Sequence, residues 1–325
     1  MNYIGSKQKL SSWIKDIVKE TYSYDLKNAI FADIFAGTGQ VSRSFKSEVN
    51  KVITNDLESY SFILNSHYIG NTEPLSEPEF VFLPTKGVIY SNFTDASAIP
   101  RKFFTEENAM IIDGIRKEIE NEYLLSNINI KQYYWLLASL IESADTVANT
   151  TSVYGAFLKQ FKKTALKEIQ FKLYPYEITH QNNEIYQSDA NSLIKKIKGD
   201  ILYLDPPYNN RQYGANYHVL NRIVENKEFK SDKLTGLIEY NKSDYCKPAI
   251  VSDVFEQLIS DADFEFIYIS YNNEGLIKEH DFKNILKKYG LYSLYLKEYK
   301  RFKADSQRPN QPAKTFEHLH FLRKK

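Results

Sequence analysis

The feature that most constrains this chain is an acid, two prolines and an aromatic residue at the end of an apolar segment. Asp200 to Leu204 (Asp-Ile-Leu-Tyr-Leu) is typical of a buried strand, and Asp205-Pro206-Pro207-Tyr208 follows it directly. Proline has no amide hydrogen to donate to a neighbouring strand, so the strand must end there in a rigid turn. The turn presents hydrogen-bond acceptors, namely the Asp205 carboxylate and the Pro206 carbonyl.

Acceptors next to an aromatic ring suit a planar heterocyclic base that carries an exocyclic amino group. Open α/β sheets bind ligands at the carboxyl ends of their strands, where this turn would lie. Asp205 and Pro206 could accept both amine hydrogens while Tyr208 stacks on the ring. This would draw the nitrogen toward tetrahedral geometry and direct its lone pair at an electrophile. We therefore expect the catalytic residues to be Asp205, Pro206, Pro207 and Tyr208.

A second pattern near the N-terminus predicts a site for a ribose-containing cofactor. Ala29–Phe35 is typical of a buried strand, a glycine turn follows at Gly37 and Gly39, and Lys51–Thr54 predicts a second strand. Asp56 lies 19 positions after Gly37. Glycines let the backbone approach a nucleotide closely, and an acid about 20 residues further on can accept the ribose hydroxyls.

These patterns predict a Rossmann-like, doubly wound α/β sheet that is interrupted by a mainly helical insertion. We place the sheet domain at 1–58 and 185–325 and the inserted domain at 59–184. Within the insertion, Asn108–Leu125 and Ile130–Ser143 have helical periodicity. Further strands are expected at Glu184–Tyr186, Phe264–Ser270, Tyr292–Tyr299 and Thr315–Leu322, the last two as an antiparallel pair.

Composition excludes several classes of protein. The 325 residues include 42 basic and 41 acidic side chains and one Cys, which excludes a disulfide scaffold or a multi-thiolate metal site. No apolar run approaches the roughly 18 residues of a membrane span, so we expect a soluble cytoplasmic protein. His318 and His320 have no acidic cluster beside them, and we expect no metal site.

The order of the motifs resembles that of the Dam-like (alpha-class) adenine-N6 DNA methyltransferases. The residues that carry the resemblance are Asn2-Tyr3-Ile4-Gly5-Ser6-Lys7, Asp33–Gly39, Asn55-Asp56, Asp189 and Asp205–Tyr208. Three further stretches resemble the subgroup found in type II restriction–modification systems: Asn209–Tyr213, Asn216–His218 and Ser270–Gly275.

The resemblance implies a methyltransferase sheet with S-adenosylmethionine as the cofactor and the insertion as the target-recognition domain. Asp56 would hold the ribose, Asp189 the cofactor's adenine amino group, and Asp205 would bridge cofactor and substrate. The implied cofactor-binding residues are Tyr3, Lys7, Asp33, Phe35, Gly37, Gly39, Asp56, Asp189 and Asp205.

The same resemblance implies methylation of the N6 amine of an adenine flipped out of double-stranded DNA. We expect a monomer that protects bacterial DNA in the cytoplasm, at the nucleoid, with a cognate restriction endonuclease acting separately. Lysines interleaved with phenylalanines over 159–172 suit phosphate contacts, although a solvated amphipathic helix is an alternative. The expected DNA-binding residues are Lys159, Lys162, Lys163, Arg211, Gln212, Lys303 and Arg308.

Three alternatives remain at this stage. An RNA or protein amide methyltransferase would use a related turn, but those relatives usually carry Asn at the position of Asp205 and lack the N-terminal lysine motif. A dehydrogenase would leave the Asp205–Tyr208 turn unexplained, and Ser42 stands where its third glycine would be. A catalytically idle DNA-binding or immunity module would not need the intact pocket motifs.

Overall fold

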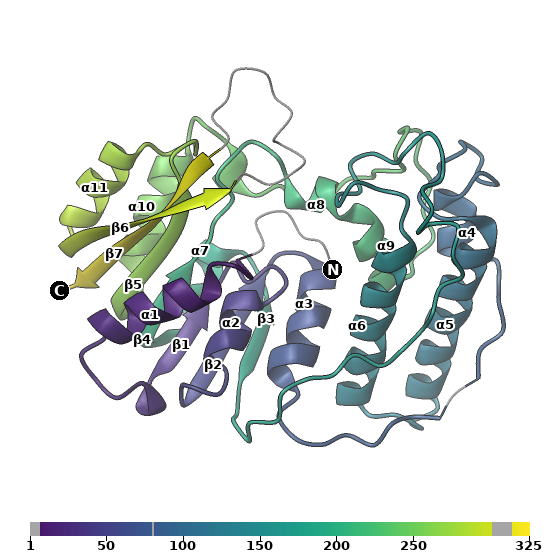
Figure 1. Ribbon diagram of the computed structural model, residues 1–325, viewed down its shortest axis with the longest axis horizontal. Coiled ribbons are helices and arrows are strands. Elements are labelled where there is room, and N and C mark those ends of the chain that lie inside the picture. The colour runs from purple at the N-terminus through teal and green to yellow at the C-terminus, as the bar shows by residue number, and fades with distance from the viewer. Residues whose placement is uncertain (1–6, 80, 301–313) are drawn as a thin grey trace. The chain divides into compact units, whose positions relative to one another are not determined.

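The computed structural model describes residues 7–79, 81–300 and 314–325, and it contains two compact units (Figure 1). Over the described residues, the sheet unit consists of 7–57, 181–212 and 242–325. The helical unit consists of 58–180 and 213–241. Tyr3, Lys303 and Arg308, which the sequence analysis selected, lie outside the described residues.

The sheet unit is built on seven strands in the order β3-β2-β1-β4-β5-β7-β6. Neighbours from β3 to β5 pair in parallel, whereas β7 pairs antiparallel with both β5 and β6. This order confirms the Rossmann-like α/β prediction and the closing antiparallel pair. The strands are β1 Ile30–Asp33, β2 Lys51–Asp56, β3 Glu184–Gln187, β4 Lys198–Leu204, β5 Asp263–Asn272, β6 Gly290–Lys300 and β7 Lys314–Lys324.

Helices cover both faces of this sheet because its central strands are apolar on both faces. Ala32 and Leu202 share one core with residues of α7, α10 and α11, whereas Phe31 stacks on Phe45 of α2 on the other side. Helix α1 packs against α2. The helices of this unit are α1 Ser11–Thr21, η1 Leu26–Asn28, α2 Gln40–Phe45, α7 Ala190–Leu193, η3 Asp244–Cys246, α10 Val251–Asp261 and α11 Glu279–Lys287.

The helical unit has a separate apolar core. Its long helices begin where the sequence supplies caps: the Thr105 hydroxyl accepts from Asn108, and Asn129 and Gln132 form a capping box. The two predicted long helices are confirmed. The helices are α3 Ser59–Asn65, the π-helical turn η2 Ser66–Gly70, α4 Val88–Phe93, α5 Glu106–Leu124, α6 Ile130–Val147, α8 Tyr213–Asn216 and α9 His218–Glu225. Among the described helices, none has the length and apolar composition needed to cross a membrane.

Two expectations about the insertion need correction. Residues 148–183 contain neither helix nor strand, so the lysine-rich segment 159–172 is not the solvated helix of the alternative interpretation. Side-chain hydrogen bonds from Asn149 and from Asn108 of α5 organise this segment instead of a repeating backbone pattern. Residues 213–241 belong to the helical unit rather than to the sheet domain, because α9 buries Val219, Leu220 and Ile223 in its core.

Candidate active site

Three of the predicted acids lie at, or directly after, the carboxyl ends of adjacent parallel strands. Asp33 ends β1 and is aligned with Thr54 of β2 and Tyr203 of β4. Asp56 and Asp205 each come two residues beyond those partners. Both carboxyls are near enough to raise the pKa of Asp33. The register therefore brings three residues that are far apart in sequence to one edge of the sheet, where α/β folds bind ligands.

The glycine turn after β1 has the geometry that the sequence predicts. Gly37 and Gly39 have φ values of 53° and 72°, a left-handed backbone that glycine adopts without strain. The turn is fastened to β2, since the Ala36 amide donates to the Asn55 carbonyl (2.9 Å) and the Gly37 amide to Asp56 Oδ2 (2.8 Å). The structure thus gives Asp56 a second role, because its carboxylate also holds the glycine turn in position.

Asp33 is almost completely buried and has one clear side-chain partner. The Ser42 hydroxyl donates to its Oδ2 at 2.7 Å. Its Oδ1 has no well-formed hydrogen bond within the described part of the chain. Burial raises the pKa of Asp33 to about 7, although the hydrogen bond from Ser42 lowers it. A buried acceptor without a donor is a place where a bound polar or cationic group would be stabilised.

Lys7 forms a buried ion pair with the acid of the proline turn. Lys7 Nζ lies 2.9 Å from Asp205 Oδ1, and the two side chains are 8% and 20% exposed. Burial raises the pKa of Asp205, and the Lys7 ammonium opposes that rise. The pair engages Oδ1, so the second oxygen of the carboxylate, Oδ2, can serve as an acceptor for a ligand.

The proline turn itself is open to ligands on one side. Pro206 is buried, whereas Pro207 and Tyr208 are partly exposed. Tyr208 meets Tyr271 edge to face with ring centroids 6.5 Å apart, and its carbonyl accepts the Leu276 amide at 2.9 Å. These contacts hold the ring without covering it fully, so Tyr208 can still offer a face for stacking.

The remaining predicted cofactor residues line the same edge. Phe35 is partly exposed and packs edge to face on Tyr245 at 4.9 Å. Asp189 follows β3, is exposed, and uses Oδ1 to accept the Ser192 amide at the start of α7.

The described members of the predicted DNA-binding set belong to both units and differ in exposure. Lys159 and Lys163 are exposed, whereas Lys162 donates to the Thr150 carbonyl at 2.8 Å. Burial lowers the pKa of Lys162. In the sheet unit, the side-chain amide of Gln212 donates to the Ser243 carbonyl at 3.1 Å, and its oxygen accepts the Ser243 amide at 2.8 Å. Lys162 and Gln212 therefore stabilise the backbone of the loops that they contact.

Two further residues of this edge were assigned no role by the sequence analysis. Glu317 of β7 lies 3.4 Å from Lys7 Nζ, and its signal is a charged residue inside a strand buried on both faces. Asn55 joins two loops, because its amide donates to the Ile34 and Ser188 carbonyls and its oxygen accepts the Ser188 amide. Its only sequence signal is its place next to Asp56.

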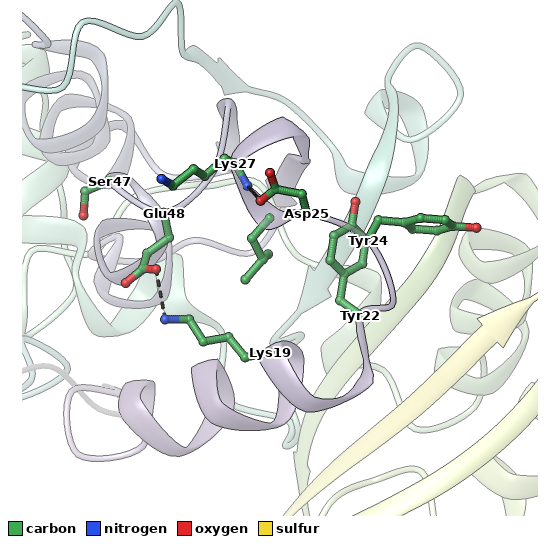
Figure 2. Close-up of a pocket in the computed structure, with 8 residues that line it drawn as sticks. Lys19, Tyr22, Tyr24, Asp25, Lys27, Ser47 and Glu48 are labelled. Carbon is green, nitrogen blue, oxygen red and sulfur yellow. Dashed lines mark hydrogen bonds and ion pairs between the residues drawn. The ribbon is translucent and has the colours of Figure 1, made fainter.

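A cavity of about 340 Å³ lies elsewhere in the sheet unit, and Figure 2 shows it. Its residues come from α1 and from the segments that precede β1 and β2, at the opposite edge of the sheet from the acids. Lys19 and Glu48 form an ion pair across part of it at 2.9 Å. The lining residues are Lys19, Tyr22, Tyr24, Asp25, Leu26, Lys27, Ser47 and Glu48.

Comparison with known proteins gives matches over most of the chain. The model of a family described as D12 class N6 adenine-specific DNA methyltransferase matches residues 3–285. The type II methyltransferase M.NlaIII of Neisseria lactamica is 47% identical over 332 residues, which cover 100% of this chain and 99% of that protein.

Two further relatives extend the range of similarity. The type II methyltransferase M.CviAII of Paramecium bursaria Chlorella virus 1 is 40% identical, over 94% of this chain and 93% of that protein. The type II methyltransferase M.FokI of Planomicrobium okeanokoites is 36% identical over 100% of this chain but only 53% of its own length.

Proposed function

Because the chain belongs to the D12 class of N6 adenine-specific DNA methyltransferases, we propose that the carboxyl edge of its sheet catalyses transfer of a methyl group from S-adenosylmethionine to an adenine flipped out of duplex DNA. The observation that supports this most strongly is the buried Lys7–Asp205 pair, which leaves one Asp205 oxygen as an acceptor beside Tyr208.

The residues at this edge fit S-adenosylmethionine. Asp33 is a buried acid whose Oδ1 completes no good hydrogen bond among the described residues, which suits a cofactor that carries an ammonium and a sulfonium group. The turn at Gly37 and Gly39 exposes backbone to the methionine end, beside Phe35. Asp56 would bind the ribose and Asp189 the adenine amino group. Lys7 and Tyr3 complete the proposed set.

When bound, the cofactor supplies an electrophilic methyl group on a sulfonium. The protein's part is to orient the acceptor amine. Asp205 Oδ2 and the Pro206 carbonyl accept the two hydrogens of the exocyclic nitrogen, and Tyr208 stacks on the purine. Because Pro206 and Pro207 have no amide hydrogen, the corner cannot offer a competing donor to the amine. The Lys7 ammonium favours the ionised, accepting form of Asp205, because it opposes the rise in pKa that burial causes.

Contacts with DNA are proposed from the exposed basic residues. Lys159 and Lys163 of the helical unit and Arg211 of the sheet unit are exposed and can neutralise phosphates. Lys162 and Gln212 would support binding indirectly, by holding the loops from which these residues extend. Lys303 and Arg308 are proposed as further phosphate contacts from sequence alone.

The similarity to methyltransferases of type II restriction–modification systems supports a protective role. We infer that the enzyme modifies one specific sequence in bacterial DNA, as a monomer, and that it acts in the cytoplasm at the nucleoid. A cognate restriction endonuclease would cut the same sequence when it is unmodified, as a separate protein.

One experiment tests the reaction class directly. The protein is incubated with S-adenosylmethionine labelled in the methyl group and, separately, with duplex DNA, RNA and a protein extract. We expect label in duplex DNA, recovered after digestion as 6-methyladenine. Label confined to RNA or protein, or recovered as a methylated cytosine, would contradict the proposal.

A further inference from the structure

Glu317 reaches the candidate active site from a strand that carries none of the family motifs. Strand β7 runs antiparallel to β5, and Glu317 is aligned with Asn272, the last residue of β5. The N-terminal part of β7 therefore lies at the same edge of the sheet as Asp33 and Asp205. The position of Glu317 is set by strand register and not by a mobile loop.

Glu317 shares Lys7 with Asp205. Its Oε1 lies 3.4 Å from Lys7 Nζ, and its side chain is 10% exposed. This oxygen completes no hydrogen bond within the described residues. Lys7 is the one basic side chain in the described part of the chain that pairs with either carboxylate. The ammonium is closer to Asp205, at 2.9 Å.

The cluster is not electrically balanced. Two carboxylates share one ammonium, so a negative charge remains when all three groups are ionised. Burial raises the pKa of Glu317 and Asp205 adds to the rise, whereas Lys7 and the Ser270 hydroxyl oppose it. An uncompensated buried charge is unfavourable for folding, and an amide or apolar side chain of similar size would avoid it. A cation that binds at this edge would restore the balance.

We propose that Glu317 supplies the negative charge by which the site distinguishes the sulfonium cofactor from its uncharged thioether product. Lys7 is balanced by Asp205, and the charge of Glu317 is left to attract the sulfonium. After the methyl group has left, S-adenosylhomocysteine has no positive sulfur, and this attraction is lost. The residue thus favours binding of the substrate and release of the product. This inference rests on the proposed function.

The test compares the two ligands in matched variants. Glu317→Gln removes the charge and keeps the size of the side chain, and Glu317→Asp keeps the charge. Glu265→Gln is the control, because Glu265 is a partly exposed carboxylate of β5 that pairs with Arg323. Dissociation constants for S-adenosylmethionine and S-adenosylhomocysteine are measured by calorimetry in the absence of DNA, with thermal unfolding recorded for every variant.

We expect Glu317→Gln to weaken S-adenosylmethionine binding by about tenfold and to change S-adenosylhomocysteine binding by less than about twofold. Glu317→Asp should retain the preference, and Glu265→Gln should match the wild type. Equal weakening of both ligands, or no change in either, would overturn the inference while leaving the proposed function intact. Wild-type protein that binds neither ligand would overturn both. If Glu317→Gln does not fold, the folded Glu317→Asp variant decides: loss of its preference for S-adenosylmethionine over S-adenosylhomocysteine would also overturn the inference.

Discussion

The acidic edge of the sheet and the irregular segment 148–183 are held in place in different ways. At the sheet edge, the register of parallel strands aligns Asp33 with Tyr203, and Asp205 follows from that alignment. In the irregular segment, single buried side chains supply the fixed points: Asn149 binds the backbone of Leu158 and Lys162, and Asn108 of α5 binds that of Ala165, Lys167 and Ile169. Strand register restricts a residue through many backbone hydrogen bonds, whereas a loop held by a few side chains depends strongly on each of them.

The difference predicts where single substitutions act. A substitution at the sheet edge should remove chemistry and leave the fold, because the backbone remains in register. A substitution at a fixed point of the loop should change the positions of several residues together. Substitutions at the sheet edge and in the segment 148–183 should therefore differ in their effects on activity and on stability.

The largest effect is expected for Asp205→Ala. The variant loses the acceptor for the amine and leaves Lys7 without its nearest carboxylate. We expect methylation of duplex DNA to fall by about 1,000-fold and S-adenosylmethionine binding to weaken. Methyl transfer is measured with labelled cofactor, and the unfolding midpoint reports on the fold. Transfer at more than a tenth of the wild-type rate would contradict the proposed mechanism.

Asn149→Ala tests the loop. Asn149 is fully buried; its amide donates to the Lys102 and Leu158 carbonyls at 2.9 and 3.0 Å, and its oxygen accepts the Lys162 amide at 3.0 Å. Leaving these groups unpaired should lower the free energy of unfolding by about 3 kcal/mol, measured in urea. DNA affinity should fall while S-adenosylmethionine binding is retained.

The matched control for the loop is Asn129→Ala. Asn129 caps α6 in the same unit, and its loss should lower the free energy of unfolding by about 1 kcal/mol without changing DNA affinity. If both variants reduced DNA affinity equally, general destabilisation would explain the effect, and the special role of Asn149 in the loop would be rejected.

Asp33→Asn tests the electrostatics of the sheet edge. Burial raises the pKa of Asp33 from 3.8 to about 7, although Ser42 donates a hydrogen bond that lowers it. Between about pH 4 and pH 7 the native state therefore binds a proton that the unfolded chain has released. Stability must fall as pH rises through this window. Asparagine can still accept from Ser42 but cannot titrate.

The quantity to measure is the unfolding free energy of the wild type minus that of Asp33→Asn. We expect this difference to decrease by about 2 kcal/mol from pH 5 to pH 7, since each unit of pH corresponds to about 1.4 kcal/mol per proton. Urea titrations of both proteins at pH 5, 6 and 7 give the values. A difference that is constant with pH would show that Asp33 is ionised throughout.

The same contrast explains what could be predicted from sequence. The proline turn, the glycine turn and the acids were identified because each requires a residue type with a distinctive backbone or charge. Glu317 was missed because its role depends on the pairing of β7 with β5, which joins residues far apart in the chain. The irregular fold of 148–183 was also missed, because asparagines that bind backbone groups 9, 47 and 61 residues away leave no periodic pattern.

The smallest effect is expected for Lys159→Ala, and it decides whether the loop contacts phosphates. Lys159 is exposed, so its removal should leave stability unchanged. DNA affinity should fall by about threefold at low salt, equally for specific and unrelated sequences, and the salt dependence of log K should decrease in slope by about one. Lys117→Ala is the control, an exposed lysine on α5 in the same unit. If Lys159→Ala and Lys117→Ala lose the same affinity with the same slope, the contribution is the net charge of the unit, and the loop provides no particular contact.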